Sequence, residues 1–293
     1  MLRRLLTYWL AALLLAGCSE AAEQSAEPAV WAVRAKGTTV YLTGTVHLLP
    51  DDITWRGGPI VAAIADADEL VTELAPNQLA RVATVASRYT YGDRLVQPRE
   101  RFDLDLRDDY VALEGKALPV VSTMAALDDW ALALMLARVS ADQAGLRADN
   151  GMDSALIAEF ASAGKARLGL ETPEDQFAAF DAIPLPEQRR MLNRLMRDMV
   201  EGRADDRLRA TVAAWSRGDM EALAAIIARD AADAPNAHRL LLADRNRKWA
   251  AWINRRLERP GTVLVAVGAG HLAGADSLLA LLTAQGLQVE RLQ

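Results

Sequence analysis

The alternation of apolar and polar residues predicts strands near both ends of the chain. Two short β-like runs, residues 30–34 and 39–43, flank a Lys-Gly pair, which is typical of a hairpin. A helix is expected over residues 59–67 and a strand over residues 69–73. Near the other end, residues 262–267 have the composition of a strand at the centre of a sheet that is covered on both faces.

In the middle of the chain, apolar residues recur with the period of a helix instead of the alternation of a strand. Residues 77–146 and 174–258 show the spacing of amphipathic helices, with one strand candidate between them at residues 167–171. A helix over residues 274–285 and a closing strand over residues 287–292 complete the pattern. We therefore predict an α/β fold that borders on α+β: one central mixed sheet built from both chain ends and flanked by helices, with a long helical middle that lies over the sheet.

The first residues have the pattern of a secretory signal, with a basic start, an apolar run too short to span a membrane, and Ala-Gly before a cysteine. The lone Cys18 makes the segment similar to a bacterial lipoprotein signal, in which cleavage precedes the cysteine and a lipid is attached to it. Residues 1–17 are then the signal peptide, residues 18–29 a tether and residues 30–293 the folded domain. The other interpretation is an ordinary signal peptide or a short anchor.

Charge and cysteine usage narrow the possible partners. Cleavage before Cys18 removes two arginines and leaves 33 − 2 = 31 basic against 39 acidic side chains, a net charge of −8. The sequence has no basic patch with interleaved aromatic residues, so no nucleic-acid partner is expected. Cys18 is the only cysteine, which excludes a cysteine nucleophile in the mature domain. Ser19 is similar to the outer-membrane-sorted form of such signals, which predicts a bacterial cell-envelope protein on the periplasmic face of the outer membrane, held by its N-terminal lipid.

The candidate chemistry lies at three strand ends. His47 follows the second predicted strand, Glu73 closes the third, and His271 follows the apolar strand near the C-terminus. Each of these histidines comes three residues after a glycine, in a chain with only three histidines. Ligands gather at the carboxyl ends of parallel strands, and two imidazoles with one carboxylate form a known type of divalent-metal site. A lone histidine, in contrast, is more often a core or surface residue.

Other polar residues fit this pocket less closely. Glu171 also ends an apolar strand, although it could instead help to begin the next helix. Arg245 and Asn246 lie on a helix shortly before the last apolar strand, where an arginine could bind a carboxylate or orient a ligand. Asp153 could simply cap or solvate its helix, and His238 is expected to be non-catalytic. The sequence has no Gly-x-Ser-x-Gly elbow, no Walker-type phosphate loop and no His-Glu-x-x-His helix.

At these residues the sequence resembles the TraB/PrgY/GumN family, which includes the animal Tiki proteins. The resemblance covers about residues 30–293, and although each matching piece is short, their order and spacing are specific. The pieces are residues 42–47, 73–74, 151–153, 170–176, 215–219, 244–246 and 267–272.

The resemblance implies a fold similar to that of the erythromycin-esterase and ChaN group. Tiki-like members are described as metal-dependent proteases that use two Gly-x-x-His motifs and a glutamate, supported by manganese or cobalt. Carried over residue by residue, this marks His47 and His271 as ligands of a divalent ion (Mn, Co or Zn) and Glu73 as a ligand or general base, while Arg245 and Asn246 match the family's Arg-Asn pair. The catalytic residues we predict are Glu73, Arg245 and Asn246, with Glu171 as the other carboxylate that could take a proton from water.

Three functions are open at this point. The first is a lipid-anchored, metal-dependent hydrolase that acts on a peptide or protein substrate, in which the ion activates a water. The second is a non-catalytic periplasmic protein that binds a peptide or a metal, because relatives are linked to peptide-pheromone inhibition. The third is an envelope structural protein whose histidines only hold strand-end turns together.

Overall fold

A six-stranded mixed sheet forms one end of the molecule, with strand order β6-β5-β7-β3-β2-β8. The computed structural model describes residues 24–92, 95–117 and 124–293. The expected signal peptide and lipidation site, residues 1–18, lie outside the described residues. The strands of the sheet are β2 (Val30–Ala35), β3 (Thr38–Thr45), β5 (Glu69–Leu74), β6 (Ala166–Glu171), β7 (Gly261–Gly268) and β8 (Val289–Arg291), and a separate small sheet pairs β1 (Gln24–Ser25) with β4 (Ile53–Thr54).

The sheet joins both ends of the chain, as the sequence predicts. The predicted hairpin is β2 and β3, which pair antiparallel across Lys36 and Gly37, both with positive φ. The apolar strand β7 pairs in parallel with β3 on one side and with β5 on the other. Strand β6, from the middle of the chain, extends the parallel part, and β8 closes the other edge antiparallel to β2.

Helices make up most of the remaining chain. Those next to the sheet are α1 (Gly58–Asp66), α7 (Met152–Ser162), α13 (Asp244–Arg256) and α14 (Leu278–Ala284). The others are α2 (Pro76–Leu79), α3 (Val82–Tyr89), α4 (Arg107–Ala117), α6 (Asp129–Gln143), α8 (Pro173–Asp181), α9 (Leu185–Val200), α10 (Arg203–Ser216), α11 (Met220–Asp233) and α12 (Pro235–His238), with the short 3-10 turns η1 (Pro98–Arg101), η2 (Leu104–Leu106), η3 (Ala148–Asn150) and η5 (Ala269–Leu272) and the π-helical turn η4 (Arg239–Ala243).

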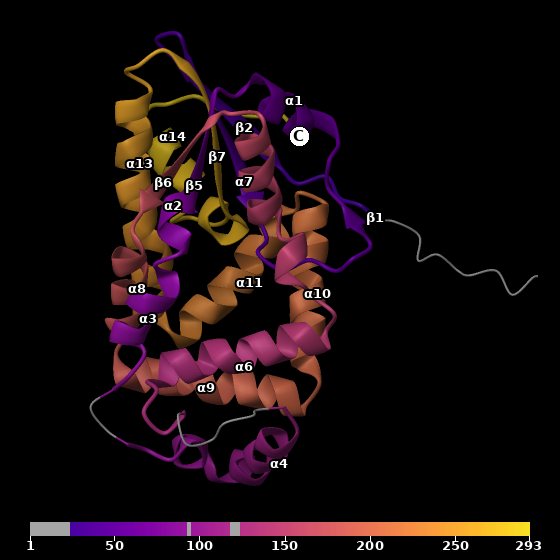
Figure 1. Ribbon diagram of the computed structural model, residues 1–293, viewed down its shortest axis with the longest axis vertical. Coiled ribbons are helices and arrows are strands. Elements are labelled where there is room, and N and C mark those ends of the chain that lie inside the picture. Colours follow the sequence, from indigo (N-terminus) through magenta and orange to yellow (C-terminus); the bar gives the residue numbers. More distant parts are fainter. Residues whose placement is uncertain (1–23, 93–94, 118–123) are drawn as a thin grey trace, which may run out of the picture.

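Each face of the sheet has its own hydrophobic core. Leu264 and Ala266 of β7 point to the core shared with α1 and α7, while Val263 and Val265 point to the core shared with α13 and α14. This alternation follows from the two-residue period of a strand. Figure 1 shows α13 and α14 on one side of the strands and α1 and α7 on the other.

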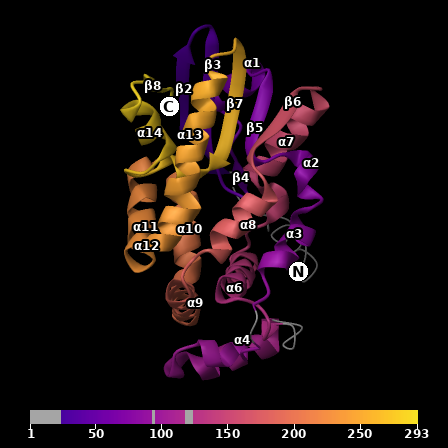
Figure 2. The ribbon, with the colours of Figure 1, turned by 90° about the vertical axis from the view of Figure 1, so that its left-hand side faces the viewer.

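The middle helices extend the molecule beyond the carboxyl ends of the parallel strands (Figures 1 and 2). Helices α6 and α9 pack with η2 and α4 around a core of their own, which includes Phe102, Tyr110, Leu132 and Leu192. The predicted fold class is confirmed. Helices α7 and α13 cover the faces of the sheet, but the rest of the helical middle lies beyond the strand ends rather than over a face. Among the described residues, every helix is too short or too polar to cross a membrane.

Candidate functional site

Four parallel strands end side by side and bring the candidate residues into one row. Glu171 is the last residue of β6, and Glu73 lies one residue before the end of β5. His271 lies in η5, directly after β7, and His47 follows β3 by two residues. Because these strands are neighbours in the sheet, the four residues stand at the same edge. Figure 1 shows this edge between the sheet and the helical half.

The guanidinium of Arg245, from the first turn of α13, joins these groups. Its Nε and Nη2 donate to the two carboxylate oxygens of Glu171 at 3.0 and 2.6 Å, a bidentate ion pair. Nη2 also donates to Oε2 of Glu73 at 2.6 Å. Nη1 donates to the carbonyl of Leu241 at 2.8 Å and faces Nε2 of His271 at 3.2 Å. Arg245 is buried, so these contacts replace its hydration.

Glu73 is held in its ionised form by donors on several sides. Its Oε1 accepts the N–H of Gly268 at 2.8 Å, and its Oε2 accepts the side-chain amide of Gln176 at 3.3 Å. Burial alone would raise the pKa of this carboxyl, but the positive charge that His271 takes up in strong acid, the guanidinium of Arg245 and the imidazolium of His47 lower the pKa of Glu73 to about 2. Glu73 is therefore a carboxylate at every physiological pH.

His271 is neutral, and its ring orientation is fixed. Asn246 donates its amide nitrogen to the carbonyl of Asp276 at 2.8 Å, so its amide oxygen accepts the hydrogen of Nδ1 of His271 at 2.7 Å. Nε2 therefore carries the lone pair of the ring. The indole of Trp249 packs on the imidazole with 4.3 Å between ring centroids. Burial lowers the pKa of His271 to about 3.

His47 lies on the open side of the row, with 66% of its side chain exposed. Its Nδ1 donates to Oδ2 of Asp153 at 2.8 Å, and the hydroxyl of Thr45 donates to Oδ1 of the same carboxylate at 2.7 Å. The hydrogen bond to Asp153 raises the pKa of His47 to about 9, and the charge of Glu73 acts in the same direction. The imidazole of His47 is thus positively charged at neutral pH, unlike that of His271.

The turn before His47 is packed too tightly to accept a side chain at its glycine. A Cβ on Gly44 would lie 2.9 Å from both Cα and Cβ of Ala269, in the turn that carries His271. The carbonyl of Gly44 accepts the indole N–H of Trp215, from α10, at 2.8 Å. The glycine of the first Gly-x-x-His motif therefore allows the two histidine turns to touch.

The start of α7 fixes the other side of the same turn. The N–H of Met152 donates to the carbonyl of Val46 at 3.1 Å. A Cβ on Gly151 would collide with the carbonyl oxygen of His47. Asp153 follows directly in the first helical turn and reaches the imidazole. The Gly-Met-Asp piece of the sequence thus works as one unit that positions His47.

This chain matches one protein-family model. Residues 29–291, nearly the whole chain, match the model of the TraB/PrgY/gumN family. The chain belongs to the TraB/PrgY/gumN family. Neither the curated proteins nor the solved structures gave a match to this TraB/PrgY/gumN chain. The family prediction is confirmed, and the likeness to the erythromycin-esterase and ChaN group stays a prediction.

The residue types of this TraB/PrgY/gumN site fit a divalent ion. One Nδ1 is held by a carboxylate at His47 and one by an amide oxygen at His271, as in the outer shell of metal-binding histidines. Nε2 of His271 and Oε1 of Glu73 are 3.8 Å apart. Two donors that each lie about 2.1 Å from one ion are at most about 4.2 Å apart, so these two could share it.

The spacing of these side chains does not form a complete metal site. Among the described residues, no three His, Cys, Asp or Glu side chains stand close enough together to hold an ion. The positive charge of Arg245 faces Glu73 and His271 instead. The donor types fit an ion although their spacing does not yet enclose one, and His47, Glu73 and His271 are the residues that would hold it.

Sequence reasoning missed three residues of this TraB/PrgY/gumN site. The sequence offers Asp153 as a residue that could cap or solvate its helix, yet it binds His47; its place in the matching Gly-Met-Asp piece is the available signal. Gln176 and Trp215 also lie in matching pieces but were given no role. Their contacts depend on how α8 and α10 dock, which no local pattern reports. His238 lies outside the row and faces Asp276 at 3.2 Å.

Proposed function

We propose that this protein is a metal-dependent hydrolase of peptide bonds, anchored to the bacterial cell envelope by a lipid on Cys18. The observation that supports it is the row of His47, Glu73 and His271 at one sheet edge, with each imidazole held by its own partner. Two imidazoles and a carboxylate of low pKa are the donors that a hydrolytic divalent ion uses.

When bound, the ion would supply Lewis acidity and an activated water. Glu171 is better suited than Glu73 to move the proton, because burial raises the pKa of Glu171 whereas that of Glu73 is about 2. Water adds to the carbonyl carbon, a carboxylate oxygen of Glu171 takes its proton, and the same group returns it to the leaving nitrogen as the C–N bond breaks. The N–H groups of Arg245 already have partners, so Arg245 would hold Glu73 and Glu171 in position, and Asn246 keeps Nε2 of His271 unprotonated.

The test is a peptidase assay with a mixture of quenched fluorescent peptides. The purified full-length chain is stripped with a chelator and then supplied with Mn²⁺, Co²⁺ or Zn²⁺. We expect cleavage that requires the ion and falls to background in His47→Ala and His271→Ala, with metal uptake measured by calorimetry in parallel. Metal-dependent cleavage that persists in both variants would exclude the mechanism.

Arg245 and Arg247 form a matched pair for the same assay. Arg247 is exposed on the same helix and pairs with Asp244. We expect Arg245→Ala to lose cleavage and Arg247→Ala to retain it. Equal loss in both variants would mean that the charge of α13, and not the contacts of Arg245, is what matters.

A binding protein without turnover is the second candidate. Arg245 already forms an ion pair with both Glu73 and Glu171, so both carboxylates have a hydrogen-bond partner without an ion. Tight metal or peptide binding with no product in the same assay would favour this candidate over the hydrolase.

A further inference from the structure

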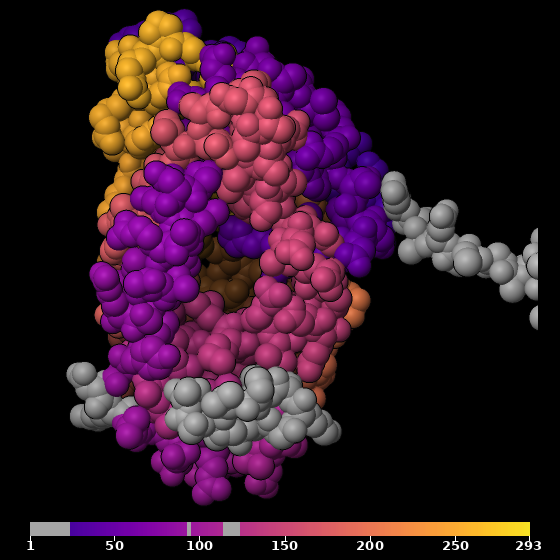
Figure 3. Space-filling view, in the orientation of Figure 1, coloured from indigo at the N-terminus to yellow at the C-terminus, as the bar shows by residue number. Residues whose placement is uncertain are grey.

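A cavity of about 590 Å³ lies in the helical half, next to the candidate site. Helices α6, α9, α10 and α11 surround it, and η4 and Arg245 form its wall toward the sheet. Figure 3 shows a hollow on this face of the molecule, above α6, with the dark orange of the C-terminal helices at its floor. Its volume is in the range of small-molecule sites, about 300 to 1,000 Å³.

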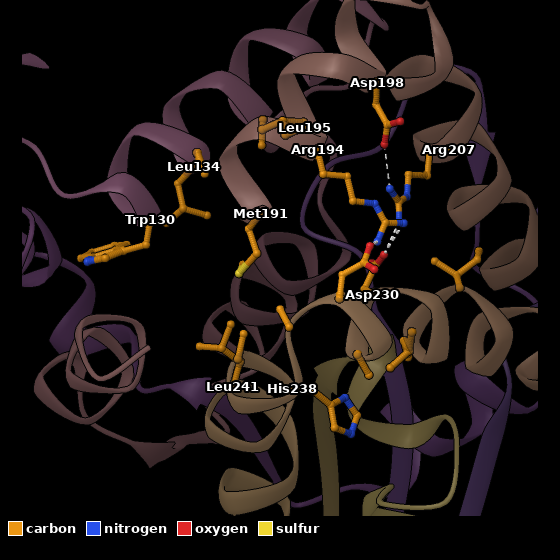
Figure 4. A pocket seen from close by; sticks show the side chains of 18 of the residues that line it. Trp130, Leu134, Met191, Arg194, Leu195, Asp198, Arg207, Asp230, His238 and Leu241 are labelled. Carbon is orange, nitrogen blue, oxygen red and sulfur yellow. Dashed lines mark hydrogen bonds and ion pairs between the residues drawn. The ribbon is translucent and has the colours of Figure 1, made fainter. Parts of the chain in front are cut away.

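Most of the wall is hydrocarbon. Trp130, Leu134, Met191, Leu195 and Leu241 line it together with several alanines and isoleucines. Figure 4 shows these side chains around the space, with the charged side chains gathered at one end. An apolar wall of this extent favours a ligand with few polar groups of its own.

The charged groups of the wall are bonded to one another. Arg194 pairs with Asp230 and Asp233, and Arg207 pairs with Asp198 and Asp230 (Figure 4). These groups therefore have their hydrogen bonds without a ligand. A peptide main chain placed in the cavity would give up its bonds to water with little return, whereas an alkyl chain has none to lose.

The cavity shares its inner wall with the candidate site. The side chains of Ile227 and Leu242 line the cavity and also pack against Gly270, the residue before His271. Arg245 lines the cavity with one side and binds both glutamates with its guanidinium. A π-helical turn, of a kind often found at functional sites, leads into Arg245. A chain in the cavity would thus end at the strand-end row.

We propose that the cavity binds the saturated acyl chain of an acylated substrate and places its polar end beside Arg245. Binding of the chain rests on the cavity alone. The statement that the acylated molecule is a substrate rests on the proposed hydrolase function.

The first experiment measures binding without turnover. A fluorescent fatty acid is bound to the full-length chain and displaced by saturated fatty acids of eight to sixteen carbons. Affinity should rise about three- to fourfold for each added methylene until the cavity is full. The variant His47→Ala, which lacks a proposed metal ligand, should bind the acids as the wild type does, so that this result is separate from catalysis.

Two neighbouring alanines of α11 supply the matched control. Ala231 lines the cavity, whereas Ala232 is exposed and does not. We expect Ala231→Phe to weaken dodecanoate binding by about tenfold or more, because the ring takes the space of several methylenes, and Ala232→Phe to leave it unchanged. Ala137→Phe, at a half-buried position on α6, repeats the test in case the first variant folds poorly. No saturable binding, or equal binding in all variants, would overturn the proposal.

The second experiment tests whether an acyl group attached to a peptide makes that peptide a better substrate. A peptide with an N-terminal dodecanoyl group is compared with the same peptide bearing an acetyl group. The proposal expects a lower KM for the acylated peptide, and loss of that advantage in Ala231→Phe. Fatty-acid binding without cleavage of either peptide would reject the hydrolase and keep the acyl site. An unacylated apolar peptide that competes for the cavity as well as dodecanoate does would reject acyl selectivity.

Discussion

At the residue scale, two histidines from the same short motif differ in charge because one binds a carboxylate and the other is buried. His47 faces the carboxylate of Asp153, which favours the imidazolium, and the pKa of His47 rises to about 9. His271 faces an amide oxygen in a buried setting, and its pKa falls to about 3. The motif fixes where each ring stands, and the helix that packs on it decides its charge.

Replacing the partner of His47 should change how stability depends on pH. The pKa of His47 lies above its ordinary value of 6.5, so its ion pair with Asp153 stabilises the metal-free fold fully below pH 6.5 and is lost as the pH rises through about 9. In Asp153→Asn we expect the pKa of His47 to fall toward 6.5 and this loss of stability to disappear. An NMR titration of His47 and urea unfolding at pH 6 and pH 10 measure both effects. An unchanged pKa in the variant would contradict the assignment.

A methyl group at the first motif glycine should separate the two histidine turns. Gly44→Ala places a Cβ 2.9 Å from the backbone of Ala269, and such overpacking costs about 1–3 kcal/mol in the free energy of unfolding. Gly57→Ala is the matched control, because a Cβ there meets nothing within 4 Å. Urea unfolding of both variants makes the comparison, and equal stabilities would show that the turns do not need the close approach.

Strand-end residues could be predicted from the sequence, and their partners could not. His47, Glu73 and His271 follow local β-like runs, so their positions at one edge follow from the sheet alone. Asp153 and Gln176 come from helices, and their contacts depend on how those helices dock against strands distant in the chain. No period or spacing in the sequence contains that information.

At the scale of elements, the site is built from the first turns of helices that follow the sheet edge. Helix α7 presents Asp153 in its first turn, and α13 presents Arg245 and Asn246 in its own. Helix α8 begins immediately after the strand that ends in Glu171, and its Gln176 reaches back to the carboxylate of β5. Strand ends therefore carry the proposed ligands, and helix starts carry the residues that support them.

Removing the N-cap of α8 should lower the stability of the fold. Thr172 caps the helix by accepting the N–H of Asp175 at 3.1 Å, and Asp175 accepts the backbone N–H of Thr172 in return. Thr172→Ala should cost about 1 kcal/mol in the free energy of unfolding. Thr283→Ala, whose hydroxyl bonds only within its own helix, is the control and should cost less. Thermal or urea unfolding measures the stability of both variants. An equal loss of stability in the two would mean that the capping hydrogen bonds of Thr172 contribute no more than the hydroxyl of Thr283.

Element types were easier to predict than element ends. The helix predicted over residues 274–285 begins only at Leu278, because Ser277 accepts the N–H of Ala280 and caps it there. The closing strand, predicted over residues 287–292, pairs only from Val289 to Arg291. Caps and pairing partners set these ends, and an apolar pattern does not contain them.

At the scale of the whole molecule, the sheet and the helical half are joined at the strand-end row. The fold class could be predicted because the spacing of apolar residues shows strands near both chain ends and helices in the middle. The placement of the helical half beyond the strand ends could not, since it depends on tertiary packing between α6 and its neighbours.

A buried arginine ties the segment before α6 to the helical half. Arg101 donates to the carbonyls of Val96 and Ala125 and to the carboxylate of Asp129, and both members of this ion pair are buried. Arg101→Met should destabilise the fold by about 3–5 kcal/mol, because it removes the partner of a buried charge. The exposed Arg99→Met is the matched control and should change little. Urea unfolding measures both, and a small effect at Arg101 would mean that Arg189 alone satisfies Asp129.

The position of β7 in the chain has a consequence for biosynthesis. The strand that pairs with both β3 and β5 begins only at Gly261, so a ribosome has made most of the chain before the sheet can close. Pairing of Thr38 with Gly261 spans more than two hundred residues, and contacts of such long range make folding slow. Until translation reaches that strand, the apolar hairpin of β2 and β3 lacks its neighbour. We therefore expect a nascent chain of this protein to need chaperone protection until its last 33 residues (293 − 260), which begin with β7, emerge.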